Sequence, residues 1–378
     1  MKVLFVTNYS LMYGANLSML DLIRHLKERH VEITVVIPSH GPLEQHLAEN
    51  GIKCVVSGFK LWRQSKLNWK SGLIFTYNHL IQLNKIIKAC GTDFDLVHSN
   101  SSMTDIGQQI ARRLRIPHIW HLRENGKYDY PSKFVVPSFL ARRVMESATV
   151  LVSVSRSLQD FYSSEICPKG RYRVIYDGIS APVYQRTSHA LNCVHFCCTG
   201  TIIPGKGQML ILQAGQMLLE RGITGWDLSL IGLTFRNVYV QEVESYIKDH
   251  HMEPYVKIYE YRSDVLELLK TMDVGVMSSK NEAFGRVTVE YMLMGMPVIG
   301  TNSGGTAEII EHNRSGFLFE PDNAKELADY MEYYISHPQA IFSHGEYGSH
   351  RAVECFSSER NAEEIYRLYQ EILRDKKR

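Results

Sequence analysis

The chain has 378 residues, of which 44% are hydrophobic and 22% charged, and its formal net charge is +2. At about 100–200 residues per domain this length predicts two domains, and the composition is that of a folded globular protein. The balance of 42 basic and 40 acidic residues excludes a nucleic-acid binder that works through bulk charge. The first apolar run ends at Asn8, too early for a secretory signal, and no run approaches the about 20 residues of a membrane span.

Short β-rich runs alternate with helical stretches through the first half of the chain. Strands are expected at residues 2–7, 32–37, 53–57, 96–99, 118–121, 149–154 and 173–176. Helices are expected at 16–29, 75–89 and 104–114. Apolar strands that alternate with helices are typical of a buried parallel sheet covered on both faces.

The segment 178–192 has no clear period and is interpreted as an interdomain linker, after which the alternation resumes. The later strands are expected at 193–199, 227–231, 256–259, 274–277, 298–300 and 317–318. Helices are expected at 207–221, 237–250, 262–271, 287–294, 324–336 and about 358–374. The pattern predicts two doubly wound α/β domains, residues 1–185 and 186–357, whose ligands bind outside the carboxyl ends of the strands.

The cysteines are odd in number, have no zinc-site spacing and lie mostly in apolar segments, so we expect reduced core residues of a cytosolic protein. They are Cys54, Cys90, Cys167, Cys193, Cys197, Cys198 and Cys355.

The segment 278–311 carries two carboxylates beyond an expected strand. Glu282 lies in a polar loop, and Glu290 follows eight residues later inside a helix. Carboxylates accept paired hydrogen bonds from vicinal hydroxyls, so a sugar or a ribose is their natural partner. The amides of Phe284, Gly285 and Arg286 lie at the helix N-terminus, where an anion is favoured. The alternative is that both glutamates are ordinary surface residues.

Two glycine-rich turns accompany the glutamates. Gly304 and Gly305 precede a helix, where glycine lets the backbone approach a ligand closely. The run from Gly200 to Lys206 and Gly207 follows the first strand of the second domain and suits a diphosphate. It is not a P-loop, because no Ser or Thr follows the lysine. Each turn would also serve as a plain strand-to-helix connection.

The first domain offers weaker signals. Gly14 opens a helix, and His121 ends a strand, where its imidazole could donate to a phosphate or a sugar hydroxyl. Asp93 and Asp95 form an Asp-x-Asp string of a kind that holds a metal in some sugar-nucleotide enzymes. Because Asp95 runs directly into a strand, a strand lead-in is the better interpretation, and no metal site is expected.

Together these motifs resemble the signature of the family-4 retaining glycosyltransferases of the GT-B fold, the glycosyl transferases group 1. The match comprises Glu282 and Glu290 with Ala-Phe-Gly between them, the Gly-Gly turn and the glycine–lysine run. The first domain matches more loosely, through Gly14 and His121. The resemblance implies two Rossmann-like domains facing across a cleft, with the C-terminal helix, about 358–378, crossing back to the first domain.

The resemblance also implies the site roles. Glu290 would bind the ribose of a nucleotide sugar, Glu282 the donor sugar and Lys206 the departing diphosphate, while His121 would face the sugar. The donor-binding set is Gly14, Gly200, Thr201, Lys206, Ala283, Phe284, Gly285, Arg286, Glu290, Gly304 and Gly305. The donor would be a UDP- or GDP-sugar, without a metal or other cofactor. Transfer would retain configuration by front-face attack, with neither glutamate acting as a nucleophile.

Two positions depart from the family pattern. Thr201 stands where the family usually has an arginine that pairs the diphosphate, and Glu260 stands where it usually has a glycine. Arg286 or Arg123 could supply the missing cation. Thr201 also motivates an alternative function, a catalytically silent subunit that binds a nucleotide sugar or a glycan. A nucleotide-sugar epimerase is a third reading that the glutamate spacing does not support.

Residues 60–70 interleave tryptophans with cations and form the candidate acceptor surface. Trp62 and Trp69 among Lys and Arg suit a membrane–water interface, and Arg123 and Glu124 complete the candidate acceptor set. A solvated loop whose tryptophans pack locally would explain the same run. Family analogy suggests a glycan or lipid-linked glycan acceptor, cell-surface polysaccharide synthesis and a cytoplasmic, peripheral-membrane location.

Overall fold

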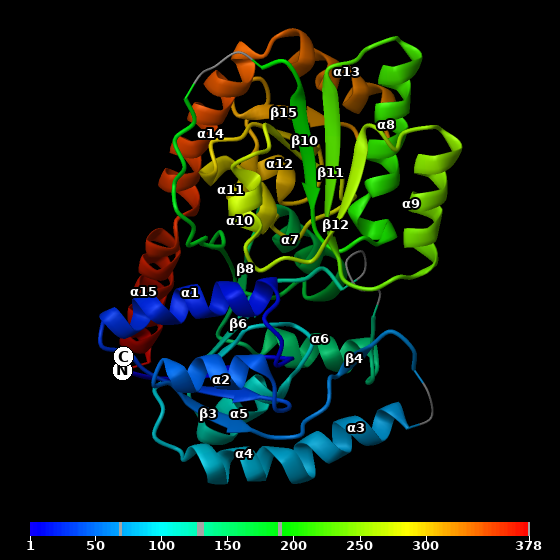
Figure 1. The fold of residues 1–378 in the computed structure, drawn as a ribbon. Coiled ribbons are helices and arrows are strands. Elements are labelled where there is room, and N and C mark those ends of the chain that lie inside the picture. The colour runs from blue at the N-terminus through cyan, green and yellow to red at the C-terminus, as the bar shows by residue number, and fades with distance from the viewer. Residues whose placement is uncertain (68–69, 127–131, 188–190, 377–378) are drawn as a thin grey trace. The chain divides into compact units, whose positions relative to one another are not determined.

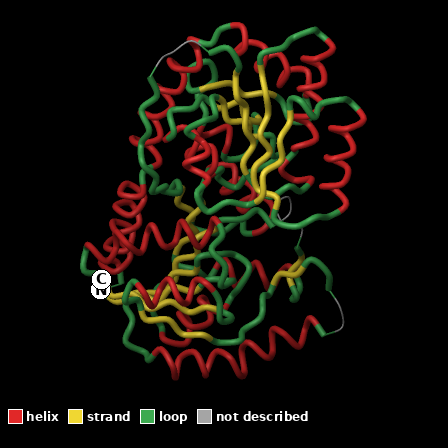
Figure 2. The backbone as a smooth tube through the Cα atoms, in the orientation of Figure 1, coloured by secondary structure: helices red, strands yellow, loops and turns green. Residues whose placement is uncertain are grey.

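The structure is a computed structural model, and it describes residues 1–67, 70–126, 132–187 and 191–376. The chain forms two compact units: Met1–Gly178 together with Ser357–Arg378, and Ile179–Phe356. Helices and strands alternate in both units (Figure 2). The predicted α/β class with two parallel sheets is therefore confirmed.

The first unit is built on a seven-stranded parallel sheet in the order β3-β2-β1-β5-β6-β8-β9. Figure 1 labels β3, β6 and β8 of this sheet. Its strands are β1 (Lys2–Val6), β2 (Glu32–Ile37), β3 (Lys53–Val56), β5 (Leu96–Ser99), β6 (His118–Leu122), β8 (Val150–Ser153) and β9 (Tyr172–Val174). Its helices are α1 (Gly14–Glu28), α2 (Pro42–Glu49), α3 (Ser71–Tyr77), α4 (Leu83–Cys90), α5 (Ile106–Leu114), α6 (Ser138–Glu146), α7 (Arg156–Phe161) and α15 (Ser358–Asp375). Two π-helical turns, η1 (Asn78–Gln82) and η2 (Tyr162–Ile166), extend α3 and α7.

Alternation along β1 produces two cores. Val3 and Phe5 pack into the cluster that α1, α2 and α15 supply, and Leu4 and Val6 pack into the cluster of α4 and α5. Successive strand residues point to opposite faces, so one short strand anchors both layers. The C-terminal helix α15 contacts α1, as expected for a helix that returns to the first domain.

The sequence did not predict the two-stranded antiparallel sheet of β4 (Arg63–Gln64) and β7 (Lys133–Phe134). Strands of two residues carry no readable period. The Asp-x-Asp string is a strand lead-in, as its position indicated: Asp93 Oδ2 lies 2.6 Å from Lys2 Nζ, and Asp95 accepts a 2.7 Å hydrogen bond from the backbone of Lys2.

The second unit contains a six-stranded parallel sheet in the order β12-β11-β10-β13-β14-β15. Its strands are β10 (Val194–Thr199), β11 (Trp226–Leu233), β12 (Val256–Glu260), β13 (Val274–Met277), β14 (Val298–Thr301) and β15 (Gly316–Phe319). Its helices are the 3-10 turn η3 (Pro204–Lys206), α8 (Gln208–Glu220), α9 (Val238–Asp249), α10 (Val265–Leu269), α11 (Arg286–Leu293), α12 (Thr306–Ile309), α13 (Ala324–Ser336) and α14 (Gln339–Phe356).

Helices cover both faces of this sheet. Val274 and Val276 of β13 belong to the core that α8, α9 and α13 complete. Gly275 faces the other way, and a Cβ built on it would lie 2.2 Å from the ring of Tyr291 in α11. A glycine in β13 therefore lets α11 pack directly on the sheet.

The segment predicted as a linker is held on the second unit over residues 179–187. The amide of Tyr184 donates a 2.8 Å hydrogen bond to the carbonyl of Leu293. The guanidinium of Arg186 donates to the carbonyls of Leu269 and Met294 at 2.8 and 3.0 Å. The segment lacks secondary structure because these bonds run to another element rather than along a ladder.

Candidate active site

The candidate donor residues follow two neighbouring strands of the second sheet. β10 lies between β11 and β13, so the chain moves to one side after β10 and returns to the other side at β13. Ligands of open α/β sheets bind at such a switch point, outside the carboxyl ends of the strands. Lys206 follows β10, and Glu282 follows β13. The topology therefore brings together side chains 76 positions apart in sequence.

Lys206 and Glu282 form an ion pair with Nζ and Oε1 2.5 Å apart. The side chains are 34% and 16% exposed, so the pair remains open to solvent on one side. The hydroxyl of Ser278 donates a 2.8 Å hydrogen bond to the carbonyl of Lys206. Gly207 has a φ of +71°, and a Cβ there would lie 2.3 Å from the carbonyl oxygen of Ser278. The loops after β10 and β13 meet only because this position is glycine.

The Glu282 carboxylate is held in its charged form. Burial would raise its pKa, but the charge of Lys206 and hydrogen bonds from Lys206 and Ser279 outweigh that effect. The pKa of Glu282 therefore lies below its ordinary value, and the group accepts hydrogen bonds at neutral pH.

Gly304 and Gly305 form the wall behind Glu282. Cβ atoms there would lie 2.5 Å from the carbonyl oxygen of Glu282 and 2.3 Å from that of Phe284. The amide of Gly305 donates a 2.8 Å hydrogen bond to the Glu282 carbonyl. The two glycines thus allow a close contact between two loops, which the sequence did not predict.

Helix α11 begins beside this wall. Ala283 and Phe284 are buried, and Gly285 precedes the helix with a φ of +107°. Glu290 lies one turn into α11, with its carboxylate 3.8 Å from the Arg286 guanidinium and both side chains at most 20% exposed. Arg286 is therefore engaged by Glu290.

Two threonines that the sequence reading missed flank Gly285. Thr288 and Thr306 are fully buried, and their hydroxyl oxygens have no hydrogen-bond partner among the described residues. A Cβ on Gly285 would lie 3.2 and 3.4 Å from these two oxygens. Unpartnered buried hydroxyls are costly and are candidates for ligand contact. Threonines within a helix carry no sequence signal for this role.

The departure at Thr201 is visible in the turn after β10. Gly200 has a φ of +147°, and its amide donates a 2.8 Å hydrogen bond to the carbonyl of Ile231. Thr201 is half-buried, and its carbonyl accepts a 3.1 Å hydrogen bond from Gln208. The turn presents backbone and a hydroxyl where an arginine was expected.

In the first unit Gly14 begins α1 and His121 lies in β6. His121 is fully buried, with Nδ1 3.1 Å from His98 Nε2, while its own Nε2 has no partner among the described residues. Burial, then the charge of Arg123 and the neighbouring His98, lowers the pKa of His121 well below its ordinary value. The imidazole is therefore neutral at pH 7.

Arg123, predicted at the acceptor or the diphosphate, is buried and paired in the interior. Its Nη1 pairs with the carboxylate of Asp177, and both side chains are at most 6% exposed. Its Nε donates a 2.7 Å hydrogen bond to Asn100. Ser18 also donates to Asp177, at 3.0 Å. A buried, fully engaged guanidinium leaves little for an incoming anion.

The candidate acceptor run is also corrected at Trp62, which is fully buried rather than at an interface. Its indole N–H donates a 2.7 Å hydrogen bond to the carbonyl of Ser102, and its ring stacks on Trp120. Glu124 accepts hydrogen bonds of 2.7 and 2.8 Å from the hydroxyls of Ser101 and Ser102. Local packing, the alternative for this run, holds for Trp62, whereas Trp69 lies outside the described residues.

Comparison with known families identifies the fold. A model described as "Glycosyl transferases group 1" matches residues 190–350, and one described as "Glycosyl transferase 4-like domain" matches residues 13–178. Each unit is thus matched by its own glycosyltransferase model, and the two models together span most of the chain. The predicted family and its GT-B fold are thereby confirmed.

Individual proteins resemble the chain in part of their length or in fold. The N-acetyl-alpha-D-glucosaminyl L-malate synthase of Bacillus anthracis is 32% identical over 35% of this chain, which aligns with only about a third (34%) of that relative's length. The capsular polysaccharide biosynthesis glycosyltransferase CapM of Staphylococcus aureus is 23% identical over 64% of this chain and 67% of its own. The crystal structure of Anabaena HepE in complex with UDP superposes with a TM-score of 0.83, covers 98% of this chain and 100% of its own, and is 21% identical.

Among the described helices, none combines the length and apolar character that a membrane crossing requires.

Proposed function

We propose that the chain is a retaining glycosyltransferase that moves a sugar from a nucleotide diphosphate sugar to a glycan or lipid-linked glycan. The observation that carries this proposal is the half-open Lys206–Glu282 ion pair at the switch point of the second sheet. It joins a cation suited to a diphosphate to a carboxylate suited to sugar hydroxyls. HepE structures described as complexes with UDP and with UDP-glucose support a uridine nucleotide as the first donor to test.

In this proposal Lys206 stabilises the charge that develops on the leaving diphosphate. Glu282 accepts hydrogen bonds from the donor sugar, and Glu290 binds the ribose hydroxyls. The Lys206–Glu282 ion pair then separates when the donor binds. Lys206 contacts the diphosphate in place of Glu282, and Glu282 contacts the sugar in place of Lys206. His121 contributes its neutral Nε2 to a substrate hydroxyl.

Retention and metal independence are part of the same proposal. Because neither glutamate acts as a nucleophile, we propose that the acceptor attacks the sugar from the face that the diphosphate leaves, and that the leaving phosphate takes the acceptor's proton. Lys206 and the amides near the glycine turns supply the positive charge for departure. Transfer should therefore persist in excess chelator, with the anomeric configuration of the donor in the product.

We place the acceptor on the first unit and the enzyme at a membrane surface, in polysaccharide assembly. The name of CapM supports the pathway class. Residues 50–92 contain no Asp or Glu. Lysines and large apolar side chains are exposed along α3 and η1 and beside them, which suits an anionic lipid surface. They are Lys66, Leu67, Lys70, Leu73, Tyr77, Leu80, Ile81 and Lys85.

The first experiment is a thermal-shift panel of UDP, GDP, ADP, CMP and dTDP, with NAD as the control. A nucleotide that binds only the folded chain stabilises it by RT ln(1 + [L]/Kd), so the melting temperature rises with the logarithm of the nucleotide concentration once that exceeds Kd. The sugar conjugates of the stabilising nucleotide are then assayed for hydrolysis and transfer. Stabilisation by none of them at millimolar concentration would contradict the proposal.

Thr201 favours a second candidate, the silent nucleotide-sugar or glycan-binding subunit. Arg123 pairs with Asp177 in the interior, and Arg286 becomes available to a diphosphate only when the ribose takes Glu290 from it. This candidate predicts nucleotide binding without hydrolysis or transfer. The variant Thr201→Arg distinguishes the two: it should raise the turnover of an enzyme and leave a silent subunit without turnover.

A further inference from the structure

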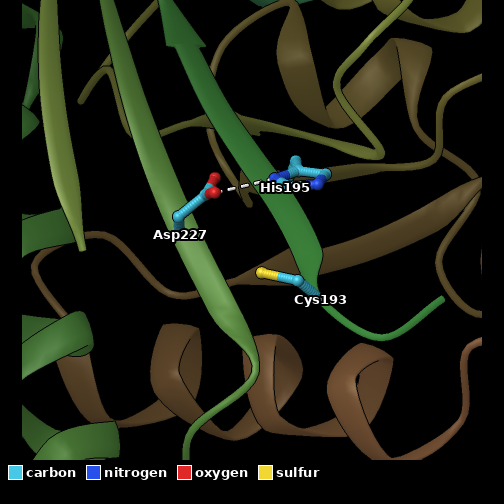
Figure 3. Close-up of side chains that lie close together, drawn as sticks. All are labelled: Cys193, His195 and Asp227. Atoms are coloured by element: carbon cyan, nitrogen blue, oxygen red, sulfur yellow. Dashed lines mark hydrogen bonds and ion pairs between the residues drawn. The ribbon is translucent and has the colours of Figure 1, made fainter. Parts of the chain in front are cut away.

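Three side chains capable of binding a metal lie together at the amino ends of β10 and β11, two inner strands of the second sheet. Cys193 directly precedes β10, His195 is the second residue of β10, and Asp227 is the second residue of β11. Their ligand atoms all lie within 4.8 Å of one another. Figure 3 shows the three side chains together, with the contact between His195 and Asp227 dashed.

The sheet geometry dictates this grouping. Cys193 and His195 are two residues apart, so along an extended backbone their side chains share a face. His195 is the register partner of Asp227 in the parallel pair of β10 and β11. Neighbouring strands lie about 4.8 Å apart, so a third ligand falls within reach of the first two. No motif reports the group, because 32 positions separate His195 from Asp227.

We propose that Cys193, His195 and Asp227 form a zinc site, with water completing the coordination. A thiolate, an imidazole and a carboxylate are together the donor set that Zn²⁺ takes. Bonds of about 2.1 Å in a tetrahedral site put two ligand atoms about 3.4 Å apart. Nδ1 of His195 and Oδ2 of Asp227 are 2.8 Å apart, and all three ligand atoms lie within 4.8 Å of one another. The ligand–ligand distance of about 3.4 Å in a tetrahedral site falls within this range.

The surroundings admit a cation from solvent. The side chains of His195 and Asp227 are 39% and 30% exposed, and Cys193 is half-buried. A second carboxylate, Asp273, accepts a 2.9 Å hydrogen bond from the His195 amide. That bond fixes the backbone of β10 beneath the ligands, as outer partners do in metal sites.

The site is separate from the proposed donor chemistry. Lys206 and Glu282 follow the carboxyl ends of β10 and β13, whereas the ligands lie at the amino ends of β10 and β11. A bound zinc would clamp the first two strands of the second unit rather than act on a substrate. We therefore expect zinc to raise the thermal stability of the chain without being required for sugar transfer.

The test uses the full chain, stripped of metal and titrated with Zn²⁺, with Co²⁺ as a spectroscopic probe. Binding of one zinc per chain with micromolar or tighter affinity, a raised melting temperature and a thiolate–cobalt charge-transfer band are expected. Cys193→Ser should abolish that band, and Asp227→Asn should weaken zinc binding at least about tenfold, the loss that even an outer partner causes.

Matched controls separate this site from incidental binding. Cys355→Ser removes another half-buried thiol, and His40→Asn breaks a 2.7 Å histidine–carboxylate contact that lacks a cysteine. Both variants should bind zinc like the parent, and circular dichroism without metal verifies that every variant folds. Zinc affinity and the cobalt band unchanged in Cys193→Ser and Asp227→Asn would overturn the proposal, as would the absence of stoichiometric binding.

Discussion

At the residue scale, the Lys206–Glu282 pair is strong enough to be formed and exposed enough to be exchanged. A deeply buried pair would be too costly to open, and a surface pair would contribute little orientation. This pair is intermediate, with its lysine 34% and its glutamate 16% exposed. The carboxylate stays ionised because Lys206 lies next to it, so the lysine would both prepare the sugar-binding group and bind the leaving group.

The first prediction concerns these two residues and Glu290. Lys206→Ala should lower kcat by about 10²–10³-fold, the loss typical of removing one preorganised charge stabiliser. Glu282→Gln should lower turnover, whereas Glu290→Gln should mainly raise KM for the nucleotide sugar. Steady-state kinetics measures each effect. Lys280→Ala is the control, because Lys280 lies on the same loop as Glu282 but is exposed and pairs with Asp322. Equal losses in Lys206→Ala and Lys280→Ala would contradict the assignment.

The second prediction concerns a buried histidine. His118 is 2% exposed, and burial lowers its pKa to about 3. Below pH about 6.5 the imidazole of His118 is therefore protonated in the unfolded chain but stays neutral in the folded chain. The free energy of unfolding consequently falls as pH falls from 6.5 toward 3. One such group contributes a slope of about 1.4 kcal/mol per pH unit.

Denaturant unfolding of the parent and of His118→Gln at pH 5, 6, 7 and 8 measures this slope. The variant should lose less stability between pH 6 and pH 5, whatever its stability at pH 8. Parallel profiles over that interval would show that His118 is not buried as a neutral ring.

Residue types and spacing were sufficient to select Glu282, Lys206 and the glycine turns as candidates, and the structure brings these residues together. They were insufficient wherever tertiary contact decides the role of a side chain. Arg123 looks available in sequence, but Asp177, which engages it, is 54 positions away. Trp62 looks like an interface residue among lysines, yet it fills the core beside Trp120. Burial of a single tryptophan or arginine has no periodic signal to read.

At the scale of elements, strands were easier to predict than helices. The core strands are short and almost wholly apolar, a pattern with few alternatives. Helix α14 was missed because Gly345 and Gly348 interrupt it, and glycine is a poor helix former. A Cβ on Gly345 would lie 2.1 Å from the carbonyl oxygen of Gly295. Close packing at this crossing therefore overrides local propensity.

The third prediction belongs to α3 and η1. Leu73 and Leu80 are 59% and 68% exposed beside the basic residues of the acid-free segment 50–92. The double variant Leu73→Ser/Leu80→Ser should reduce sedimentation with anionic vesicles at least about tenfold, since burying a leucine contributes about 1.5–3 kcal/mol. The control is Val238→Ser, which changes a residue 70% exposed on the second unit. Equal binding by all three proteins, or equal binding to zwitterionic vesicles, would remove the membrane proposal.

At the scale of the whole molecule, the chain divides its cores between two units that the sequence order does not separate cleanly. The last helix, α15, returns to the first unit, where Ile365, Leu368, Tyr369 and Ile372 join the core of β1 and α1. The first unit is thus built from both ends of the chain, and it is complete only after the second unit has been synthesised. Its stability should depend on residues near the C-terminus.

The fourth prediction tests this division with two matched substitutions. Tyr369 and Tyr334 are both fully buried, and the hydroxyl of each forms a hydrogen bond with a histidine. Tyr369 bonds to His98 at 2.6 Å, and Tyr334 bonds to His344 at 2.9 Å. Replacing a large buried aromatic residue with alanine costs about 3–5 kcal/mol. Multidomain chains need not unfold in one step, so calorimetry of the parent is expected to resolve two transitions. Tyr369→Ala should lower the melting temperature of the first unit. Tyr334→Ala should lower the melting temperature of the second unit, which is the one that zinc raises.

If each variant shifts both melting temperatures equally, the two units unfold together. The chain would then have no separate unfolding transitions that correspond to the division at Gly178 and Ser357.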